Sequence, residues 1–390
     1  MRETSQRNQG ERGTPKRYGP GVQLDIQTHV PPPPFPYYRN DKDWGKLRQP
    51  IREVVDDSDD SDEPSLDRVA IALSAPPLET APPPEIERHQ LTIVKKLGYR
   101  QEGRGAVVVT CHLDGDASRV LVAKIYDGLE YPVASYGYDF MYLADRDYSR
   151  EAGAYRAFPQ SFQGSIVPRY FGSWTFPVEE IGRGVRWVRM ILVEHVDGQC
   201  VFDLILRAKG ATGPPYKDIR KILEQPVDYA LLPPESERLE VLAAVIENDI
   251  KLSWFAGVVH HDIAPRNVLY RREDSTLRVV IIDFNDVEIR TPRLVEKQRR
   301  GERLLPLSPI ERYWAGSNFS EFAEWVPPDW DSDRDLGRLW LCERWWGSPC
   351  YRPPYDDFDD YAAEFLEKYG DRYSPDAWRK KLGFPNRRFG

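Results

Sequence analysis

Two strand-like segments, framed by polar side chains, constrain the fold of this chain more than any other feature. Residues 267–270 (Asn-Val-Leu-Tyr) and residues 277–282 (Leu-Arg-Val-Val-Ile-Ile) have the apolar, β-branched composition of strands. A polar turn separates them, so the pattern predicts a hairpin. A hairpin brings its two ends together, and we therefore expect Asn267 to lie close to Asp283.

The segment before this hairpin carries a second carboxylate. His260 is followed by Asp262 and then by Asn267, in the spacing H-x-D-x-x-x-x-N. This spacing suits phosphoryl transfer, in which the first aspartate accepts the proton of the attacking hydroxyl and the asparagine holds a magnesium ion. A later aspartate, here Asp283, holds the magnesium ion that bridges the nucleotide phosphates. Either motif alone arises by chance, but both in this order predict a phosphotransferase-type site.

On these residues the chain resembles the protein-kinase-like superfamily, which includes eukaryotic protein kinases and aminoglycoside phosphotransferases. The resemblance implies an α+β fold of two lobes, a small antiparallel β lobe with one helix and a larger, mainly helical lobe. It implies ATP and Mg²⁺ as cofactors, with Asn267 and Asp283 as metal ligands. Asp262 would then deprotonate the acceptor hydroxyl, and Arg266 would neutralise charge near the acceptor. The resemblance covers residues 90–290 well and residues 291–390 poorly.

The family also requires a lysine on its third strand. Residues 122–125 read Val-Ala-Lys-Ile, which is similar to the family's V-A-I-K strand. The resemblance implies that Lys124 contacts the α- and β-phosphates. The alternative is a solvated lysine on an edge strand.

A glutamate on the following helix should pair with that lysine. Residues 148–158 are predicted to be helical, and apolar residues share the face of Glu151. A carboxylate on such a face needs a cation, because an unpaired buried charge is costly. Lys124 is the expected partner, and the alternative is a surface glutamate that pairs with Arg150 or Arg156.

The nucleotide-contacting segments are less regular. Gly103, Gly105 and Val107 lie in a turn that departs from the family's G-x-G-x-x-G-x-V, although its end matches G-x-V. Backbone amides of a glycine turn can hold phosphate, but an ordinary hairpin turn accounts for the same residues. After an apolar strand, the main chain of Glu194 and Val196 would contact the adenine edge.

Other departures leave the acceptor open between serine or threonine, tyrosine and a small molecule. His261 replaces the arginine that usually precedes the catalytic aspartate, and Ala264 replaces the lysine of serine/threonine kinases. Asn285 replaces the glycine of D-F-G, and asparagine tolerates left-handed backbone angles. An ATP-dependent phosphotransferase is the main prediction. The alternative is a pseudokinase or scaffold that acts through protein interactions.

Composition predicts three regions. The first 84 residues hold 14 of the 34 prolines, and residues 56–63 are almost wholly acidic. We expect a disordered arm at 1–89, an N-terminal lobe at 90–196 and a C-terminal lobe at 197–390, in which the aromatic-rich end contributes to packing. The Pro31–Pro36 segment could serve as a ligand for an SH3- or WW-type partner, and Ser58 and Ser61 could be phosphorylated.

Net charge and hydropathy limit the classes of partner that we expect for this chain. The net charge is −8, which argues against nucleic acid as a partner. The sequence contains no signal peptide pattern and no apolar run of membrane-spanning length. The four cysteines show no C-x-x-C spacing, so we expect neither zinc nor a disulfide framework. These features predict an intracellular protein, cytoplasmic or nuclear, without membrane contact.

Overall fold

The computed structural model describes most of the chain, and the described residues form two compact units. The first unit takes Met1–Pro32, Arg48–Tyr148 and Phe171–His195, and the second takes Pro33–Leu47, Ser149–Tyr170 and Val196–Gly390. The chain therefore enters each unit more than once. The described residues are 17–37, 67–97, 105–131, 134–135, 138–213, 216, 219–290, 305–314 and 317–352.

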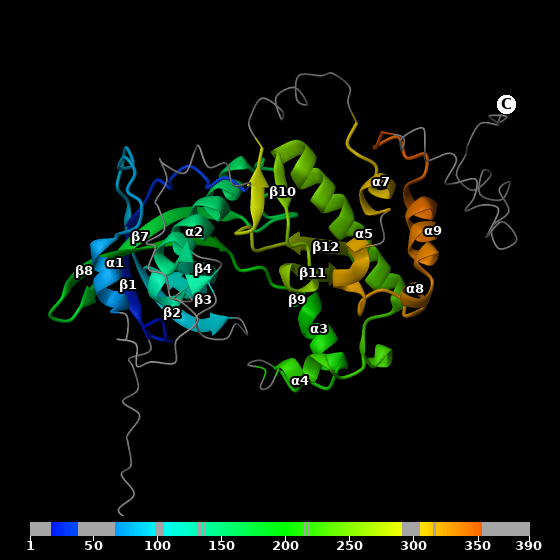
Figure 1. The fold of residues 1–390 in the computed structure, drawn as a ribbon, viewed down its shortest axis with the longest axis horizontal. Helices are drawn as coiled ribbons and strands as arrows, with labels where there is room; N and C mark the ends of the chain where they lie inside the picture. The colour runs from blue at the N-terminus through cyan, green and yellow to red at the C-terminus, as the bar shows by residue number, and fades with distance from the viewer. Residues whose placement is uncertain are drawn as a thin grey trace, which may run out of the picture. The chain divides into compact units, whose positions relative to one another are not determined.

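A closed barrel of six strands dominates the first unit (Figure 1). Strand β1 closes the barrel because it pairs antiparallel with β2 through Leu24 and Leu91 and with β7 through Gln27 and Thr175. Around the barrel the strands are β1 (Gln23–Thr28), β2 (Arg88–Leu97), β3 (Val107–Leu113), β4 (Leu121–Tyr126), β8 (Gly184–Glu194) and β7 (Tyr170–Glu180).

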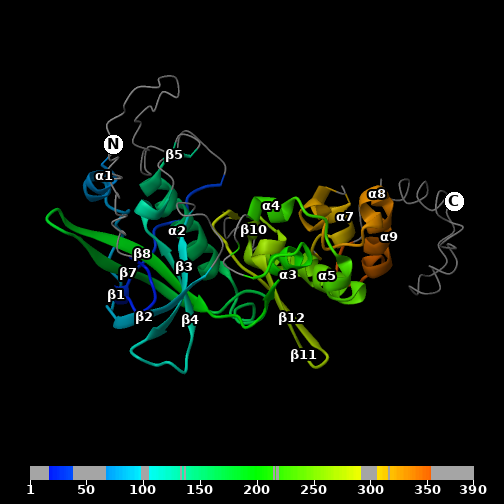
Figure 2. The ribbon, with the colours of Figure 1, turned by 90° about the horizontal axis from the view of Figure 1, so that it is seen from below.

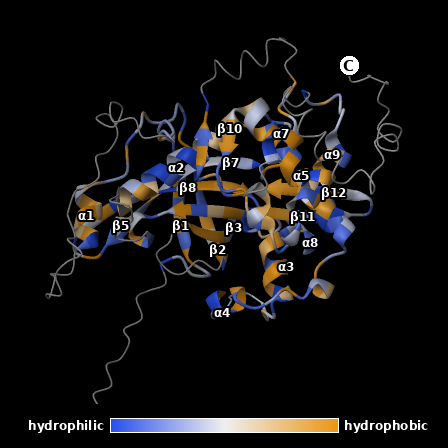
Figure 3. Ribbon diagram, turned by 45° about the vertical axis from the view of Figure 1, so that its right-hand side comes forward, coloured by the Kyte–Doolittle hydropathy of each residue, from blue (hydrophilic) through white to orange (hydrophobic). Residues whose placement is uncertain are grey.

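Alternating apolar residues fill this barrel. Successive side chains of a strand point to opposite faces, so every second residue reaches the interior. Ile93 of β2, Val109 of β3, Ala123 of β4 and Met190 of β8 are at most 1% exposed and belong to one apolar cluster. Figure 3 colours much of the barrel strands orange, which marks apolar residues. The barrel thus holds a packed core.

The predicted fold class, a bilobal protein-kinase-like fold with a mainly helical large lobe, is wrong. The β part is a closed barrel of six strands, and the helical content of the described chain is modest. The decisive strand is β1, which lies in the region expected to be a disordered arm. Its Leu24 and Ile26 alternate with polar residues, but the surrounding proline-rich sequence obscured that pattern.

A helix also forms within residues 1–89. Helix α1 (Arg68–Ser74) begins at Asp67, whose side chain accepts a hydrogen bond from the Ala70 amide at 3.1 Å. Such a cap stabilises a helix start. Disorder is therefore the wrong prediction for β1 and α1. The acidic run at 56–63, with Ser58 and Ser61, lies outside the described residues.

Helix α5 (Glu235–Lys251) and the strands after it organise the second unit. The helix continues into a π-helical turn, Leu252–Ala256, which ends at Gly257 with a left-handed φ of 68°. Strand β10 (Val258–His260) then pairs with β13 (Val287–Ile289). Between them the hairpin of β11 (Val268–Glu273) and β12 (Thr276–Ile281) confirms the sequence prediction. Strand β11 also pairs with β9 (Gln199–Cys200).

Aromatic residues near the end of the described chain pack into the core of this unit. Trp325 is fully buried, and Trp345 is buried with its indole nitrogen donating to Glu247 at 3.2 Å. Helices α7 and α9 lie against each other in both views (Figure 2). The aromatic residues after residue 352 lie outside the described residues. The other elements are β5 (Ala134–Ser135), β6 (Tyr138–Asp139), α2 (Phe140–Ala157), α3 (Val201–Ala208), α4 (Ile219–Leu223), α7 (Pro309–Tyr313), α8 (Asp329–Ser332) and α9 (Arg334–Trp345).

Candidate functional site

The loop between β10 and β11 brings three predicted residues into one bonded cluster. The Asn267 side-chain nitrogen donates to Asp262 Oδ2 at 2.8 Å and to the Asp262 backbone oxygen at 2.8 Å. Arg266 forms an ion pair with Asp262 Oδ1. Residues Pro265–Asn267 make one turn of 3-10 helix, which places Arg266 and Asn267 on either side of the same carboxylate. Asp262 therefore has both oxygens engaged and remains partly accessible, with its side chain 26% exposed.

Two hydrogen bonds of the His260 ring hold the loop that carries Asp262. The Asp262 amide donates to His260 Nδ1 at 3.0 Å, so this nitrogen is an acceptor and the ring proton belongs on Nε2. Nε2 then donates to the Ile282 oxygen at 3.2 Å. His260 is only 4% exposed, and one neutral tautomer satisfies both bonds. The imidazole thus ties the Asp262 loop to the end of the hairpin.

Pairing across the hairpin brings the backbone just before Asp283 next to Asn267. Val268 pairs with Ile281 in register, and the Ile282 amide donates to the Asn267 oxygen at 3.0 Å. Asp283 follows directly, half-buried, with a left-handed φ of 68°. Aspartate is one of the few residue types enriched in this conformation. Among the described residues, the left-handed position of this turn is Asp283 rather than the expected Asn285.

Glu151 supports the segment after Asp283. Its carboxylate is fully buried and accepts from the Phe284 amide at 3.2 Å. The Phe284 ring lies 4.8 Å from the ring of Phe158 and 5.5 Å from that of Tyr155. The alternative of a surface glutamate is therefore wrong. Glu151 lies in the second unit with Asp262, Asn267 and Asp283.

Lys124 lies in the first unit, in the middle of the barrel wall. It pairs in register with Val108 of β3 and with Ile191 of β8, and it is 8% exposed. The alternative of a solvated lysine on an edge strand is therefore wrong. Its pairing with Glu151 stays a prediction.

The predicted nucleotide-contacting residues occupy strand ends. Gly105 has a left-handed φ of 104°, and Val107 is the buried first residue of β3. Gly103 lies outside the described residues. Glu194 is the half-buried last residue of β8, and Val196 follows two positions later in the second unit. Contact of any of them with a nucleotide stays a prediction.

The oxygen atoms near the hairpin end suit magnesium. The Asn267 amide nitrogen donates to Asp262, so the side-chain oxygen of this residue, which is 3% exposed, is the atom that would face a cation. Asp283 adds a carboxylate. Within the described part of the chain, no three His, Cys, Asp or Glu residues gather as a metal site. Magnesium does not require such a cage, because it commonly binds through one or two protein oxygens, water and substrate phosphates.

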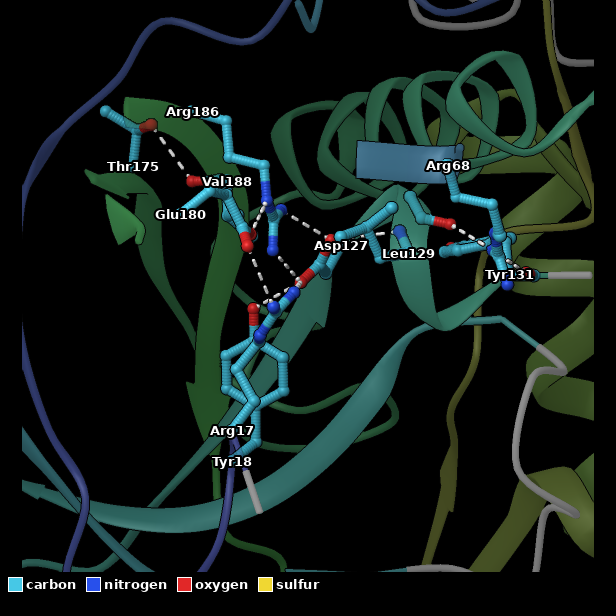
Figure 4. A network of polar contacts seen from close by, with 11 residues as sticks. Arg17, Tyr18, Arg68, Asp127, Leu129, Tyr131, Thr175, Glu180, Arg186 and Val188 are labelled. Carbon is cyan, nitrogen blue, oxygen red and sulfur yellow. Dashed lines mark hydrogen bonds and ion pairs between the residues drawn. The ribbon is translucent and has the colours of Figure 1, made fainter. Parts of the chain in front are cut away.

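Sequence reasoning missed a buried polar network at one end of the barrel (Figure 4). Arg186 donates to both Asp127 oxygens at 2.6 and 2.9 Å and to Glu180 at 2.6 Å. Tyr18 donates to Asp127 at 2.6 Å, and Arg17 donates to Glu180 at 3.1 Å. The available signal was Arg186, an arginine between the apolar residues Val185 and Trp187 of β8. The network fixes residues 17–18 to the barrel, so its role is structural.

The ionisation of this network follows from its burial. Burial raises the pKa of the Tyr18 hydroxyl well above its usual range, and the Asp127 carboxylate raises it further. Burial opposes the charge of Arg186, but Asp127 outweighs this effect, and the pKa of Arg186 is raised. Tyr18 thus stays neutral and Arg186 stays charged at any physiological pH.

Neither the family models nor the curated proteins contain a match to this chain. None of the helices in the described part of the chain is both long and apolar enough to cross a lipid bilayer.

Proposed function

We propose that this protein is a Mg-ATP-dependent phosphotransferase that transfers the γ-phosphoryl group of ATP to a hydroxyl on a protein or a small molecule. The observation that carries the proposal is the bonded cluster of Asp262, Arg266 and Asn267 at the hairpin end that bears Asp283. The relationship to the protein-kinase-like superfamily is proposed for these motifs alone, since the barrel differs from the expected fold.

Asp262 is proposed to orient and deprotonate the acceptor hydroxyl. A general base must come within about 2.6–3.2 Å of the proton-bearing oxygen, so one carboxylate oxygen has to become available. The Arg266 side chain is 48% exposed, and exposed ion pairs contribute at most about 1 kcal/mol. An incoming hydroxyl can therefore displace Arg266 from Oδ1 while Asn267 still holds Oδ2. Arg266 then remains close enough to offset negative charge at the acceptor.

Asn267 and Asp283 would hold Mg²⁺ through one oxygen atom each. The bound ion would neutralise charge on the nucleotide phosphates. We assign Lys124 to the α- and β-phosphates, the turn at Gly105 to the phosphates, and the main chain of Glu194 to the adenine. Catalysis of this kind depends on positioning and electrostatics.

We also propose an intracellular location, because Mg-ATP is abundant there and all four cysteines are free thiols. The acceptor stays open between protein and small-molecule hydroxyls.

Thermal denaturation with and without Mg-ATP tests nucleotide binding. A ligand that binds only the folded state at 100 times its Kd stabilises it by about 2.7 kcal/mol. We expect Mg-ATP to raise the Tm of the wild-type protein and to leave the Tm of Lys124→Met and of Asp283→Asn unchanged. Each variant is compared with its own ligand-free Tm, since both substitutions also affect the free protein.

Asp274→Asn is the matched control for this measurement. Asp274 lies at the opposite end of the same hairpin, is exposed, and has a left-handed φ of 51° that asparagine tolerates. Its Mg-ATP response should equal that of the wild type. If the wild-type Tm does not respond to Mg-ATP at any concentration, the alternative of a non-catalytic scaffold is favoured.

A further inference from the structure

The segment of residues 33–37 is docked inside the second unit. Phe35 is 2% exposed, and its amide donates to the Ser149 hydroxyl at 3.3 Å. Arg150, the next residue of α2, donates through Nε to the Phe35 oxygen at 3.1 Å and through Nη2 to the Pro36 oxygen at 2.7 Å. Two consecutive residues of α2 therefore hold the backbone of this segment.

The same segment reaches the catalytic loop. The Tyr37 ring stacks on the His261 ring, with centroids 3.8 Å apart and planes 16° from parallel. The Arg150 guanidinium lies 5.4 Å from the centre of the Tyr37 ring. His261 directly precedes Asp262, so the stack lies one residue from the proposed catalytic base.

Arg150 also lies near Asp286, which accepts a hydrogen bond from the backbone of His261. Its Nη1 atom is 3.9 Å from the Asp286 carboxylate, and the Asp286 backbone oxygen accepts from the His261 amide at 3.0 Å. Arg150 is 7% exposed. One buried cation thus connects the docked segment, the Tyr37 ring and the turn that holds His261.

A glycine makes the close approach of this segment possible. A Cβ atom added to Gly153 of α2 would lie 2.7 Å from Pro34 Cγ and 2.9 Å from Ile289 Cδ1. Both distances are shorter than real Cβ contacts allow. Pro34 therefore packs where the helix lacks a side chain, and any larger residue would push the segment outward.

We propose that residues 33–37 form an intramolecular strap, and that Tyr37 and Arg150 are positioning residues that keep His261, and through it Asp262, in place. The proposal rests on the phosphotransferase function proposed above. Misplacing a reacting group by about 1 Å can lower the rate about 100-fold. The strap contacts the residue next to Asp262, so its loss is expected to lower the rate of turnover. An SH3- or WW-type partner of the Pro31–Pro36 segment, still a prediction, would have to detach the buried Phe35 first.

The strap is tested by comparing Tyr37→Ala with Tyr37→Phe in the full chain. Phenylalanine keeps the ring stack, whereas alanine removes it. Amide hydrogen exchange of residues 258–264 reports on the loop without any need for activity. Release of inorganic phosphate from Mg-ATP, with water as acceptor, reports on turnover. We expect Tyr37→Ala to speed exchange in this loop and to lower kcat about tenfold or more, with the KM for ATP unchanged. Tyr37→Phe should stay closer to the wild type than Tyr37→Ala in both measurements.

A second variant, Arg150→Lys, keeps the charge but loses the paired hydrogen bonds to Phe35 and Pro36. It should shift exchange and kcat in the same direction as Tyr37→Ala. Unchanged loop exchange in Tyr37→Ala would overturn the strap, and faster exchange with unchanged kcat would overturn the positioning role. If the wild-type protein neither releases phosphate nor gains Tm with Mg-ATP, the proposed function fails by itself, and the exchange measurement still decides whether the strap holds the loop.

Discussion

The ionisation of His29 illustrates how surroundings set the behaviour of single residues in this protein. His29 follows β1, and its Nδ1 lies 2.6 Å from the Tyr148 hydroxyl. Burial, together with the charge of Arg189, lowers the pKa of His29 from 6.5 to about 3. Between these two values the unfolded chain binds a proton that the folded protein does not bind. The contribution of neutral His29 to stability is therefore complete above pH 6.5 and declines as the pH falls towards 3.

We accordingly predict that His29→Gln weakens the pH dependence of folding stability. The measurement is the urea midpoint of unfolding at several pH values between 3.5 and 7. The wild-type midpoint should fall with pH more steeply than that of the variant. His195→Gln, at an exposed histidine, is the control. Parallel pH profiles for the wild type and His29→Gln would contradict the assigned cause.

At the scale of elements, the buried network at the barrel end should contribute strongly to the free energy of unfolding. Arg186 pairs with both Asp127 and Glu180, and both carboxylates are at most 8% exposed. Arg17 also pairs with Glu180, but its side chain is 34% exposed. Removing one partner of a buried ion pair leaves an uncompensated charge and typically costs about 3–5 kcal/mol. We expect Arg186→Met to lower the free energy of unfolding by that amount, measured by urea denaturation.

Arg183→Met provides the comparison for this experiment. Arg183 lies in the turn between β7, which ends at Glu180, and β8, which contains Arg186. Both side chains of its ion pair with Asp67 are exposed. Its loss should change the urea midpoint little, because water replaces the partner. A similar effect of both substitutions would show that burial of the network does not govern its contribution.

Local elements of this chain were predictable, and long-range ones were not. The hairpin of β11 and β12 joins neighbouring segments, so composition and turn pattern were sufficient to predict it. Strand β1 pairs with β2 across about 60 residues, and no local pattern encodes such pairing. Its short alternation was also outweighed by nearby prolines. Because β1 was missed, the expected small antiparallel sheet is in fact a closed barrel.

In the candidate site, too, the contacts between sequence neighbours were predictable and the long-range contacts were not. Asp262, Arg266 and Asn267 lie within six residues, and their spacing predicted that they would meet. The contact of Tyr37 with His261 joins positions more than 200 residues apart, so spacing carried no signal for it. The sequence indicated Arg150 only as an alternative surface partner of Glu151, whereas Arg150 is buried against the strap.

For the molecule as a whole, residues with a proposed role occur in each of the two units. The first unit contributes Lys124 from the barrel wall, and the second contributes Asp262, Asn267 and Asp283 from the loop and hairpin. Helix α2 belongs to both units, since their boundary falls between Tyr148 and Ser149. We propose that Asp262, Asn267 and Asp283 of the second unit act together in phosphoryl transfer.

Transfer of label from γ-³²P-ATP to an acceptor tests the proposed phosphoryl transfer. The acceptors are supplied by heat-treated cell extract, which contains no active kinases, and the products are separated by mass. We predict Mg²⁺-dependent labelling by the wild-type protein and by Asp274→Asn. Asp262→Asn should lose labelling by about 100-fold or more while its Tm still rises with Mg-ATP, because it removes the base and keeps the nucleotide ligands. Equal labelling by Asp262→Asn, or wild-type labelling that is independent of Mg²⁺, would contradict the proposed phosphotransferase function.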